Sequence, residues 1–274
     1  MLELLKIEWL KLKNYKAFLI IGIFFILGIF ITNYMVLTIF NKMVDKTEAG
    51  MLLGKFMPYD FKHVWQTTSY ASGYILILPV MLLIMLVTNE FTYKTSRQNI
   101  IDGISRLDFI HVKIILATLF AIISTIFVVI TGFALASTTG TEFSLYGFSQ
   151  VGYFFLKAIT YNFIAVFISV LIKRTGFAIG VYFIYMSAEN IIAQLLDVWS
   201  MKIKADSKLD LGSLGSYLPM NASDSLLSFP DNPFQSFAKK AFPTDYHYLT
   251  ISIALFFVVL FYWLSRSIIL KKDL

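Results

Sequence analysis

Six long apolar runs, each about as long as a bilayer is thick, divide this chain of 274 residues. The hydrocarbon core is about 30 Å thick and a helix rises about 1.5 Å per residue, so roughly 20 apolar residues cross it. Backbone groups in lipid must pair within one helix, because an open strand edge leaves them unsatisfied. The pattern therefore predicts an all-α polytopic membrane protein, with one transmembrane domain over residues 1–274. The six predicted transmembrane helices are residues 17–40, 72–88, 114–136, 152–172, 176–196 and 248–267.

The composition supports this class and excludes several others. Hydrophobic residues make up 58% of the chain and charged residues 15%, against about 25% charged in a soluble domain. The chain has no cysteine, which excludes disulfides, thiolate metal sites and a cysteine nucleophile. His63, His111 and His247 stand far apart and match no ligand spacing, so we expect no metal site. The net charge of +6 does not indicate a nucleic-acid partner, because basic residues in a membrane chain mark cytoplasmic loops.

The basic residues also predict the orientation of the spans. With six spans, four basic sets fall on one side: the N-terminus, the segment 89–113, the pair Lys173–Arg174 and the C-terminus. On the other side, the loop 137–150 has no Lys or Arg, and the loop 41–71 offsets its lysines with acids. We therefore place both termini and residues 89–113 in the cytoplasm. The first run is too long for a signal peptide and lacks a small-residue cleavage site, so we expect a retained signal-anchor in a bacterial inner (cytoplasmic) membrane.

Two segments outside the spans carry apolar patterns. In residues 2–16, an apolar residue recurs every three or four positions (Leu2, Leu5, Trp9), which predicts an amphipathic helix in the plane of the lipid headgroups. The alternative is the polar start of one long first helix. Residues 197–247 are rich in leucine and aromatic residues, and Asn232-Pro233 is typical of a helix start. We expect short outer helices that form a cap before the last span, the alternative being a disordered loop.

The chain lacks the motifs of an ATPase or of a membrane enzyme. The run Gly50–Phe56 resembles a phosphate-binding loop, but it has three residues instead of four between its glycines and no hydroxyl after Lys55. No kinase, dinucleotide-binding or nucleophile-elbow pattern is present. We therefore expect no catalytic residue and no cofactor bound by this chain.

Polar residues inside the predicted spans are costly in lipid and so are candidates for function. Glu189 and Asn190 lie in the fifth run with Gln194 one turn further, while Asn33 lies in the first run and Asn162 in the fourth. They either line a substrate path or form hydrogen bonds between packed helices. For Glu189 a third alternative is a carboxylate that reaches the outer interface.

Gly176 and Gly180 form a GxxxG pattern at the start of the fifth run. Such a pattern lets two helices approach closely. We interpret it as a packing surface, either within the chain or at a dimer seam.

The polar segment 89–113, NEFTYKTSRQNIIDGISRLDFIHVK, is too short for a domain and is not arranged as a catalytic site. A short helix is predicted across Ser96–Ile104, because Arg97, Ile100 and Ile101 fall on adjoining turns. Gly103 or Ser105 would end it before the third span. A short helix that carries apolar and basic groups suits docking into a groove on a partner protein.

The order of residues in this segment resembles the first cytoplasmic loop of ABC-2 type transporter permeases. Those proteins have an acidic residue at the end of span two, a Gly-Thr pair, a short coupling helix, a small residue, Ser/Thr-Arg, and a lysine that opens span three. Lys94 stands here where glycine is usual, and Gly103 where proline is often found. The matching positions are Glu90, Thr95, Arg97, Gly103, Ser105, Arg106 and Lys113.

The resemblance extends to the whole plan of the chain and implies a function. It implies that two permease subunits pair, as a homodimer or a heterodimer, and that each binds a separate ATP-binding subunit at residues 89–113. ATP and Mg²⁺ would be bound by that partner. Arg97 and Arg106 would pair with acidic residues on the partner or with lipid phosphates, the alternative being membrane anchoring alone. The implied activity is the export of an amphipathic peptide, a drug or a lipid-linked compound.

Two other classes of function stay open on the sequence. One is a non-transporting anchor or immunity-type protein that binds a ligand at its outer cap, residues 197–247. The other is a membrane-embedded enzyme, which would need several carboxylates or histidines at one depth. The sequence offers only Glu189 for that purpose.

Overall fold

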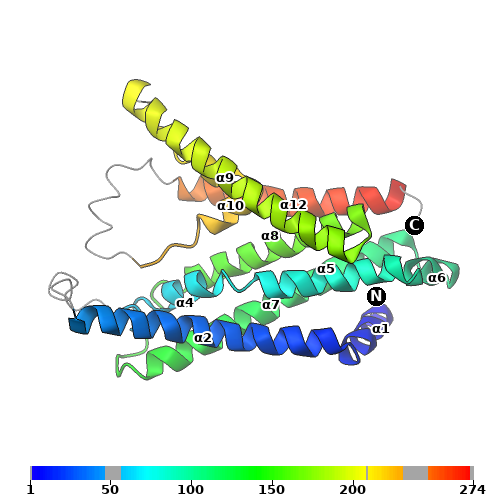
Figure 1. Ribbon diagram of the computed structural model, residues 1–274, viewed down its shortest axis with the longest axis horizontal. Helices are drawn as coiled ribbons and strands as arrows, with labels where there is room; N and C mark the ends of the chain where they lie inside the picture. Colours follow the sequence, from blue (N-terminus) through cyan, green and yellow to red (C-terminus); the bar gives the residue numbers. More distant parts are fainter. Residues whose placement is uncertain (1, 47–56, 208, 231–245, 272–274) are drawn as a thin grey trace.

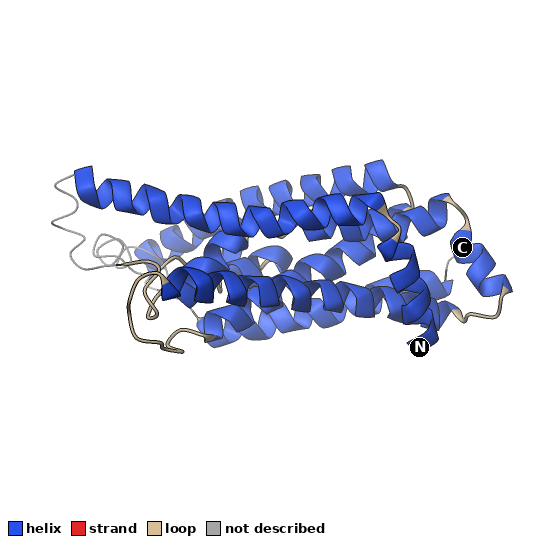
Figure 2. Cartoon of the chain, turned by 90° about the horizontal axis from the view of Figure 1, so that it is seen from below, coloured by secondary structure: helices blue, strands red, loops and turns tan. Residues whose placement is uncertain are grey.

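The computed structural model describes residues 2–46, 57–207, 209–230 and 246–271, and the side chains of residues 2, 3 and 43–46 are left out of the description. Within these residues the chain is helical and has no strand (Figures 1 and 2). The predicted all-α class is therefore confirmed. The elements are α1 (Leu2–Lys13), α2 (Lys16–Lys46), α4 (Val64–Ser72), α5 (Ile77–Thr92), α6 (Thr95–Ile101), α7 (Arg106–Ser137), α8 (Ser149–Ile172), α9 (Thr175–Ser207), the 3-10 turn η1 (Leu214–Tyr217), α10 (Pro219–Asp224) and α12 (His247–Lys271).

Five of the described helices are long and apolar enough to cross a membrane: α2, α7, α8, α9 and α12. A sixth crossing is formed if α4 and α5 count as one span, since these two helices are bent by 45° at a short break. The chain therefore has five or six candidate membrane-spanning helices, in line with the six apolar runs. This makes it a membrane protein by the length and composition of its helices.

The break between α4 and α5 differs from the single run predicted over residues 72–88. The first helix begins at Val64, eight residues before that run, and the backbone turns at residues 73–76. Pro79 then lies in the first turn of α5, where a residue without an N–H is tolerated. The chain therefore breaks just before the proline, and α5 itself starts as a new helix.

The centre of the bundle is α8, which packs against α5, α7 and α12. About two thirds of the residues in the most apolar stretch of α8 are buried inside the protein. In the corresponding stretches of α2, α9 and α12, most residues are not buried. Small and aromatic residues on α8, among them Phe154, Ala158 and Ala165, are fully buried in the main hydrophobic cluster. The outer helices keep large apolar side chains exposed, such as Phe24 on α2 and Ile184 on α9, as expected of surfaces that face lipid.

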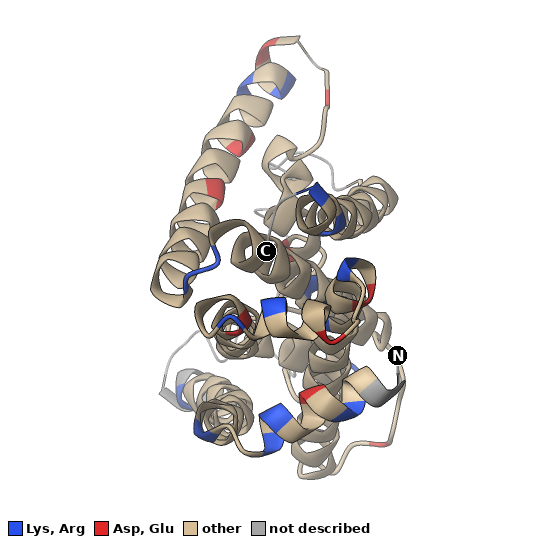
Figure 3. Ribbon diagram, turned by 90° about the vertical axis from the view of Figure 1, so that its right-hand side faces the viewer, with Lys and Arg blue, Asp and Glu red and all other residues tan. Residues whose placement is uncertain are grey.

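The bundle has two chemically different ends. The α1 end holds α1, α6 and the starts of α7 and α9, at the right of Figure 1; Figure 3 looks onto it and shows many of its basic and acidic residues. The α10 end holds α4, η1 and α10, and α9 slants away from the other helices there. A turn at residues 14–15 separates α1 from α2, so the two are distinct helices.

The segment 197–247 is only partly described. Its first residues continue α9 to Ser207, so the helix runs beyond the predicted end at residue 196. Two short elements follow, η1 and α10, which pack against α9 and α12. The predicted helix start at Asn232-Pro233 and the Gly50–Phe56 run lie outside the described residues.

Candidate functional site

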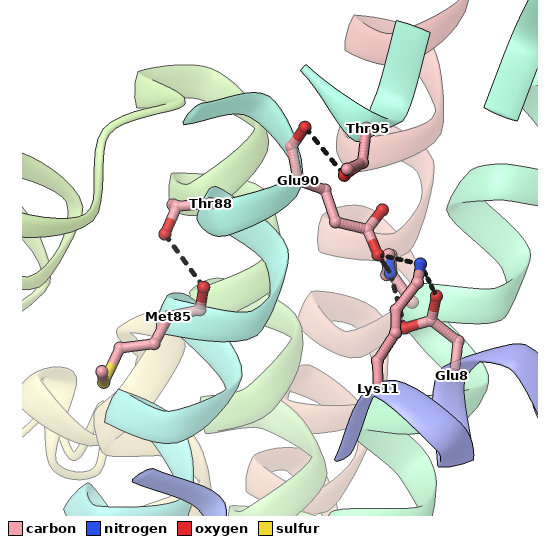
Figure 4. Close-up of polar contacts among 7 residues, drawn as sticks. Glu8, Lys11, Met85, Thr88, Glu90 and Thr95 are labelled. Carbon is pink, nitrogen blue, oxygen red and sulfur yellow. Dashed lines mark hydrogen bonds and ion pairs between the residues drawn. The ribbon is translucent and has the colours of Figure 1, made fainter. Parts of the chain in front are cut away.

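Four charged side chains meet at the α1 end (Figure 4). Lys113 Nζ lies 2.7 Å from Glu8 Oε2 and 2.6 Å from Glu90 Oε1. Lys11 Nζ lies 2.8 Å from Glu8 Oε1 and 2.8 Å from Glu90 Oε1. These four residues, Glu8, Lys11, Glu90 and Lys113, are called the charge cluster below. The cluster joins α1, the end of α5 and the start of α7, which are distant in sequence.

Three members of the charge cluster are buried and the fourth, Lys11, is partly exposed; the four charges sum to zero. The exposed fraction is 1% for Lys113, 5% for Glu90 and 8% for Glu8, and the Lys113 ammonium also faces the Phe109 ring at 5.4 Å. Removing charges from water costs several kcal/mol per ion, and only close counter-charges offset that cost. Two acids and two bases that share short hydrogen bonds meet this condition. The cluster therefore forms a specific connection between α1, α5 and α7, and we expect the removal of one member to destabilise the protein.

The pKa values of Glu8 and Lys11, the two members on α1, agree with ion pairing. Burial alone would raise the pKa of Glu8, but Lys113 and Lys11 outweigh it and hold that pKa at about 2. Burial would likewise lower the pKa of Lys11, but Glu90 and Glu8 keep it above its usual value. At neutral pH both groups therefore carry their charges, and α1 is tied to the bundle by ion pairs.

Helix α6 is joined directly to the charge cluster. It follows α5 after two residues, and the Thr95 hydroxyl donates to the Glu90 carbonyl oxygen at 3.3 Å (Figure 4). The same residue, Glu90, holds both lysines of the cluster through its carboxylate. Glu90 therefore connects α6 with α1 and α7 through polar contacts.

The two positions that depart from the permease pattern both have a positive φ. Lys94 has φ = 58°, in the left-handed region that favours glycine, which is the residue usual at this position in the family that the loop resembles. Gly103 has φ = 95°, which proline cannot adopt. The helix was predicted over Ser96–Ile104, but it ends at Ile101 because the chain turns at Gly103. Ser105 then caps α7 by accepting a hydrogen bond from the Asp108 N–H at 3.0 Å.

The predicted coupling residues divide into exposed and buried sets. Ile101 is 84% exposed and Arg97 is also exposed, so they can meet a partner protein. Thr95, Gly103 and Ser105 are exposed as well, while Ile100 and Arg106 are half-buried. Glu90 is buried in the charge cluster and is therefore a connecting residue and not a docking residue.

We expect Lys94→Gly to raise the free energy of unfolding by about 1 kcal/mol, because a left-handed conformation costs a non-glycine residue about 1–2 kcal/mol. Denaturant unfolding in a mild detergent measures the change. The matched control is Gln98→Gly on α6, an exposed helical position at which glycine should cost about 1 kcal/mol. A Lys94→Gly variant as unstable as Gln98→Gly would contradict the backbone argument.

Glu189 is held by α10 inside the protein. It is 5% exposed, and its Oε1 accepts hydrogen bonds from the backbone N–H groups of Met220 at 2.6 Å and Asn221 at 2.9 Å, and from Asn221 Nδ2 at 3.2 Å. Pro219 starts α10, so the carboxylate occupies the place of an N-terminal cap. Of the three alternatives that the sequence left open for Glu189, these contacts fit hydrogen bonding between packed helices.

The two intramembrane asparagines also bond to neighbouring helices. Asn33 is fully buried; its Nδ2 donates to the Ser72 hydroxyl at 3.0 Å, and Tyr59 donates to its carbonyl oxygen at 2.8 Å. Asn162 Nδ2 donates to the Ala117 carbonyl oxygen on α7 at 2.8 Å. Both side chains thus connect helices.

The remaining predicted positions lie on the surface of α9. Asn190 and Gln194 are exposed, and Asn190 borders a cavity at the α10 end. A Cβ added at Gly176 or Gly180 would meet no atom within 4 Å, so neither glycine serves close packing within the described part of the chain. The other interpretation of the GxxxG pattern, a seam with a second subunit, stays a prediction.

Four partner residues escaped the sequence analysis. Glu8 and Lys11 of the charge cluster were assigned no partner, nor were Lys157 and Asp224, whose charged atoms lie 3.2 Å apart at the α10 end. One signal was present: Lys157 interrupts an otherwise apolar run, and a charge in such a place needs a counter-charge. Its partner could not be found from sequence alone, because Asp224 lies in a later segment.

No protein-family model matches the chain, and no curated protein matches it either. The fold class stands on the helices themselves: an all-helical protein with five or six candidate membrane-spanning helices. A more particular assignment depends on α6, the charge cluster and the resemblance of residues 89–113.

Proposed function

We propose that this chain is the permease subunit of an ABC-2 type transporter, and that a separate ATP-binding subunit docks on α6. The observation that carries the proposal is the placement of α6: an exposed helix connected through Glu90 to a buried charge cluster that joins α1, α5 and α7. A docking helix with a rigid polar connection to three helices suits the transfer of movement from a soluble motor into a membrane bundle.

The proposal includes an orientation and a set of partners. The α1 end faces the cytoplasm of a bacterial cell, with α1 in the headgroup plane and both termini inside, and η1 and α10 belong to the outer cap. ATP and Mg²⁺ are bound and ATP is hydrolysed on the partner, so this chain is not itself the enzyme. A second permease subunit, identical or different, completes the pathway, and the uncovered face of α9 around Gly176 and Gly180 is available for it. The direction is export of an amphipathic compound.

The contacts support a transfer of movement from α6 to α5, α7 and α1. A force on the exposed side of α6 reaches Glu90 through the Thr95 hydrogen bond and through the continuous backbone to α5. Since Lys113 bonds Glu90 and Glu8 at once, α7 and α1 move with α5 or the cluster breaks. Breaking it would strand buried charges, which is strongly unfavourable. The three helices therefore respond as one unit.

Co-purification from the native membrane in mild detergent tests the proposal. We expect a P-loop ATP-binding subunit to accompany the wild type, and its yield to fall by more than about tenfold with Ile101→Glu, because a charge at an apolar anchor removes a central contact. Ile101 is 84% exposed, so the change should not disturb folding. Tyr146→Glu is the matched control, since Tyr146 is 73% exposed at the opposite end of the bundle.

Two outcomes would contradict the proposal. One is a wild-type protein that brings down no ATP-binding subunit even after gentle crosslinking. The other is an equal yield with Ile101→Glu and Tyr146→Glu, which would move the docking surface away from α6.

A further inference from the structure

A partly open cavity of about 560 Å³ with several polar groups lies at the α10 end, bordered by the α4–α5 bend, α8, α9, η1 and α10. The volume falls within the range of about 300–1,000 Å³ typical of small-molecule sites. Its wall combines three tyrosines with a lysine, two amides and two carboxylates, of which Asp197 is bonded to the Gly215 N–H and Asp224 faces the lysine. Among the wall residues are Tyr70, Tyr74, Tyr161, Lys157, Asn190 and Asp224.

The lysine in this wall is buried but only loosely paired. Lys157 is 8% exposed, and its Nζ lies 3.2 Å from Asp224 Oδ1. Charge-assisted hydrogen bonds are normally about 2.7–2.9 Å, and the contacts in the charge cluster are 2.6–2.8 Å. Its other neighbours are aromatic: the Tyr161 ring at 5.2 Å and the Tyr74 ring at 5.8 Å. An ammonium has three N–H donors, so Lys157 has donors left for a ligand.

The carboxylate opposite has spare capacity too. Asp224 Oδ2 accepts a hydrogen bond from the Tyr161 hydroxyl at 2.8 Å, while Oδ1 has no hydrogen bond and only faces Lys157. Gly73 in the α4–α5 bend leaves room beside the ammonium, since a Cβ there would lie 3.1 Å from Lys157 Nζ. The pair therefore presents one positive and one negative group to the same space.

The charges decide which ligand can separate this pair. An anionic ligand on Lys157 would leave the Asp224 carboxylate without its counter-charge, and a cationic ligand on Asp224 would strand the lysine. Either result is unfavourable, because Lys157 is buried and Asp224 is only partly exposed. A zwitterionic group satisfies both charges at once, with its anion on Lys157 and its cation on Asp224 and on the Tyr74 ring, which is exposed.

We propose that this cavity binds the zwitterionic headgroup of an amphiphile. An apolar tail has a path beside the headgroup, because Ile77 and Phe183 also border the cavity and α9 leaves large apolar side chains uncovered. That the amphiphile is transported rests on the proposed function, whereas its binding does not.

Binding is tested on the purified permease alone, in maltoside micelles. Because the chain has no cysteine, Asn190→Cys gives a single site for an environment-sensitive fluorophore at the cavity rim. The probes are three amphiphiles with the same dodecyl chain and different headgroups: phosphocholine, phosphate and trimethylammonium. We expect the phosphocholine probe to bind at least about tenfold more tightly than either singly charged probe, as the stranded-charge argument requires.

Variants of the ion pair should change which of the three headgroups binds most tightly. In the labelled background, Lys157→Met should favour the cationic probe and Asp224→Asn the anionic probe. The double variant, Lys157→Met with Asp224→Asn, stays neutral and should lose the preference for phosphocholine. Lys204→Met is the matched control, because it breaks the Lys204–Asp210 ion pair outside the cavity and should leave all three affinities unchanged.

The source of the headgroup is read by competition in nanodiscs made of anionic lipid. Displacement of the phosphocholine probe by added phosphatidylcholine identifies a membrane lipid as the ligand, and lack of displacement identifies a soluble amphiphile; both support the site.

Equal affinities for the three headgroups, or a preference for phosphocholine that survives the double variant, would overturn the proposed site. If binding is selective but no ATP-binding subunit co-purifies, only the proposed function is contradicted. If an ATP-binding subunit co-purifies but binding is not selective, only this inference is contradicted.

Discussion

Lys113→Met is expected to lower the free energy of unfolding by about 3–5 kcal/mol, the range found when one partner of a buried ion pair is removed. The reason is the balance of the charge cluster. Without Lys113, the carboxylates of Glu8 and Glu90 share only Lys11, so a buried negative charge stays unpaired. Denaturant unfolding in a mild detergent measures the loss.

A second substitution separates charge balance from packing. Lys113→Met combined with Glu90→Gln restores a neutral cluster, so we expect the double variant to be more stable than Lys113→Met alone. If the two changes add, or if Lys113→Met costs less than about 1 kcal/mol, as exposed ion pairs do, the cluster is not the buried connection described here.

Glu189→Leu is expected to cost about 2–5 kcal/mol, because it leaves the N–H groups of Met220 and Asn221 without an acceptor and each buried donor costs about 1–3 kcal/mol. The loss should concentrate in α10, so limited proteolysis near residues 219–224 should speed up along with the drop in unfolding free energy. Glu189→Gln keeps an oxygen acceptor and should lose only about 1 kcal/mol.

The neighbouring residue supplies the control for Glu189. Asn190→Leu lies on the exposed side of the same helix and should change the unfolding free energy by no more than about 0.5 kcal/mol. Equal effects of Glu189→Leu and Asn190→Leu would show that the α10 cap contributes little, and would return Glu189 to the candidates for a substrate path.

The long helices were predictable because their signal is local. Runs of apolar residues predicted α2, α7, α8, α9 and α12, since a lipid-facing helix must be apolar along its whole length. Helix α4 was not predicted, because it is buried by protein and carries polar residues. Its Thr67 hydroxyl donates to the Pro58 carbonyl oxygen at 2.6 Å, a tertiary contact with no hydropathy signature.

The candidate site was predictable only in part, for the same reason. The segment that forms α6 stood out as a polar island, and its turn residues fixed the place of the helix to within a few residues. The charge cluster did not stand out, because Lys11 and Glu90 are 79 positions apart and Glu8 and Lys113 are 105 apart. Pairing over such distances depends on how helices pack, and a single sequence does not contain that information.

The length of α9 has a consequence for the depth of the α10 end. At about 1.5 Å per residue, its 33 residues span roughly 50 Å, against a hydrocarbon core of about 30 Å. Tilting the whole helix into that thickness would need roughly 50°, beyond the usual range of about 0–40° for hydrophobic mismatch. Its apolar part up to Leu196, roughly 33 Å long, already fits the core, so the turns from Asp197 onward emerge from it.

Asp197 thus marks the level at which α9 leaves the hydrocarbon, and Trp199 beside it is a residue type enriched at that boundary. The Asp197 carboxylate accepts the Gly215 N–H at 2.8 Å, which fixes η1 at the same level. Since Asp197 also borders the cavity, this part of the cavity wall lies at the level of the phospholipid headgroups. A lipid could therefore present its headgroup there by lateral diffusion, without leaving the bilayer.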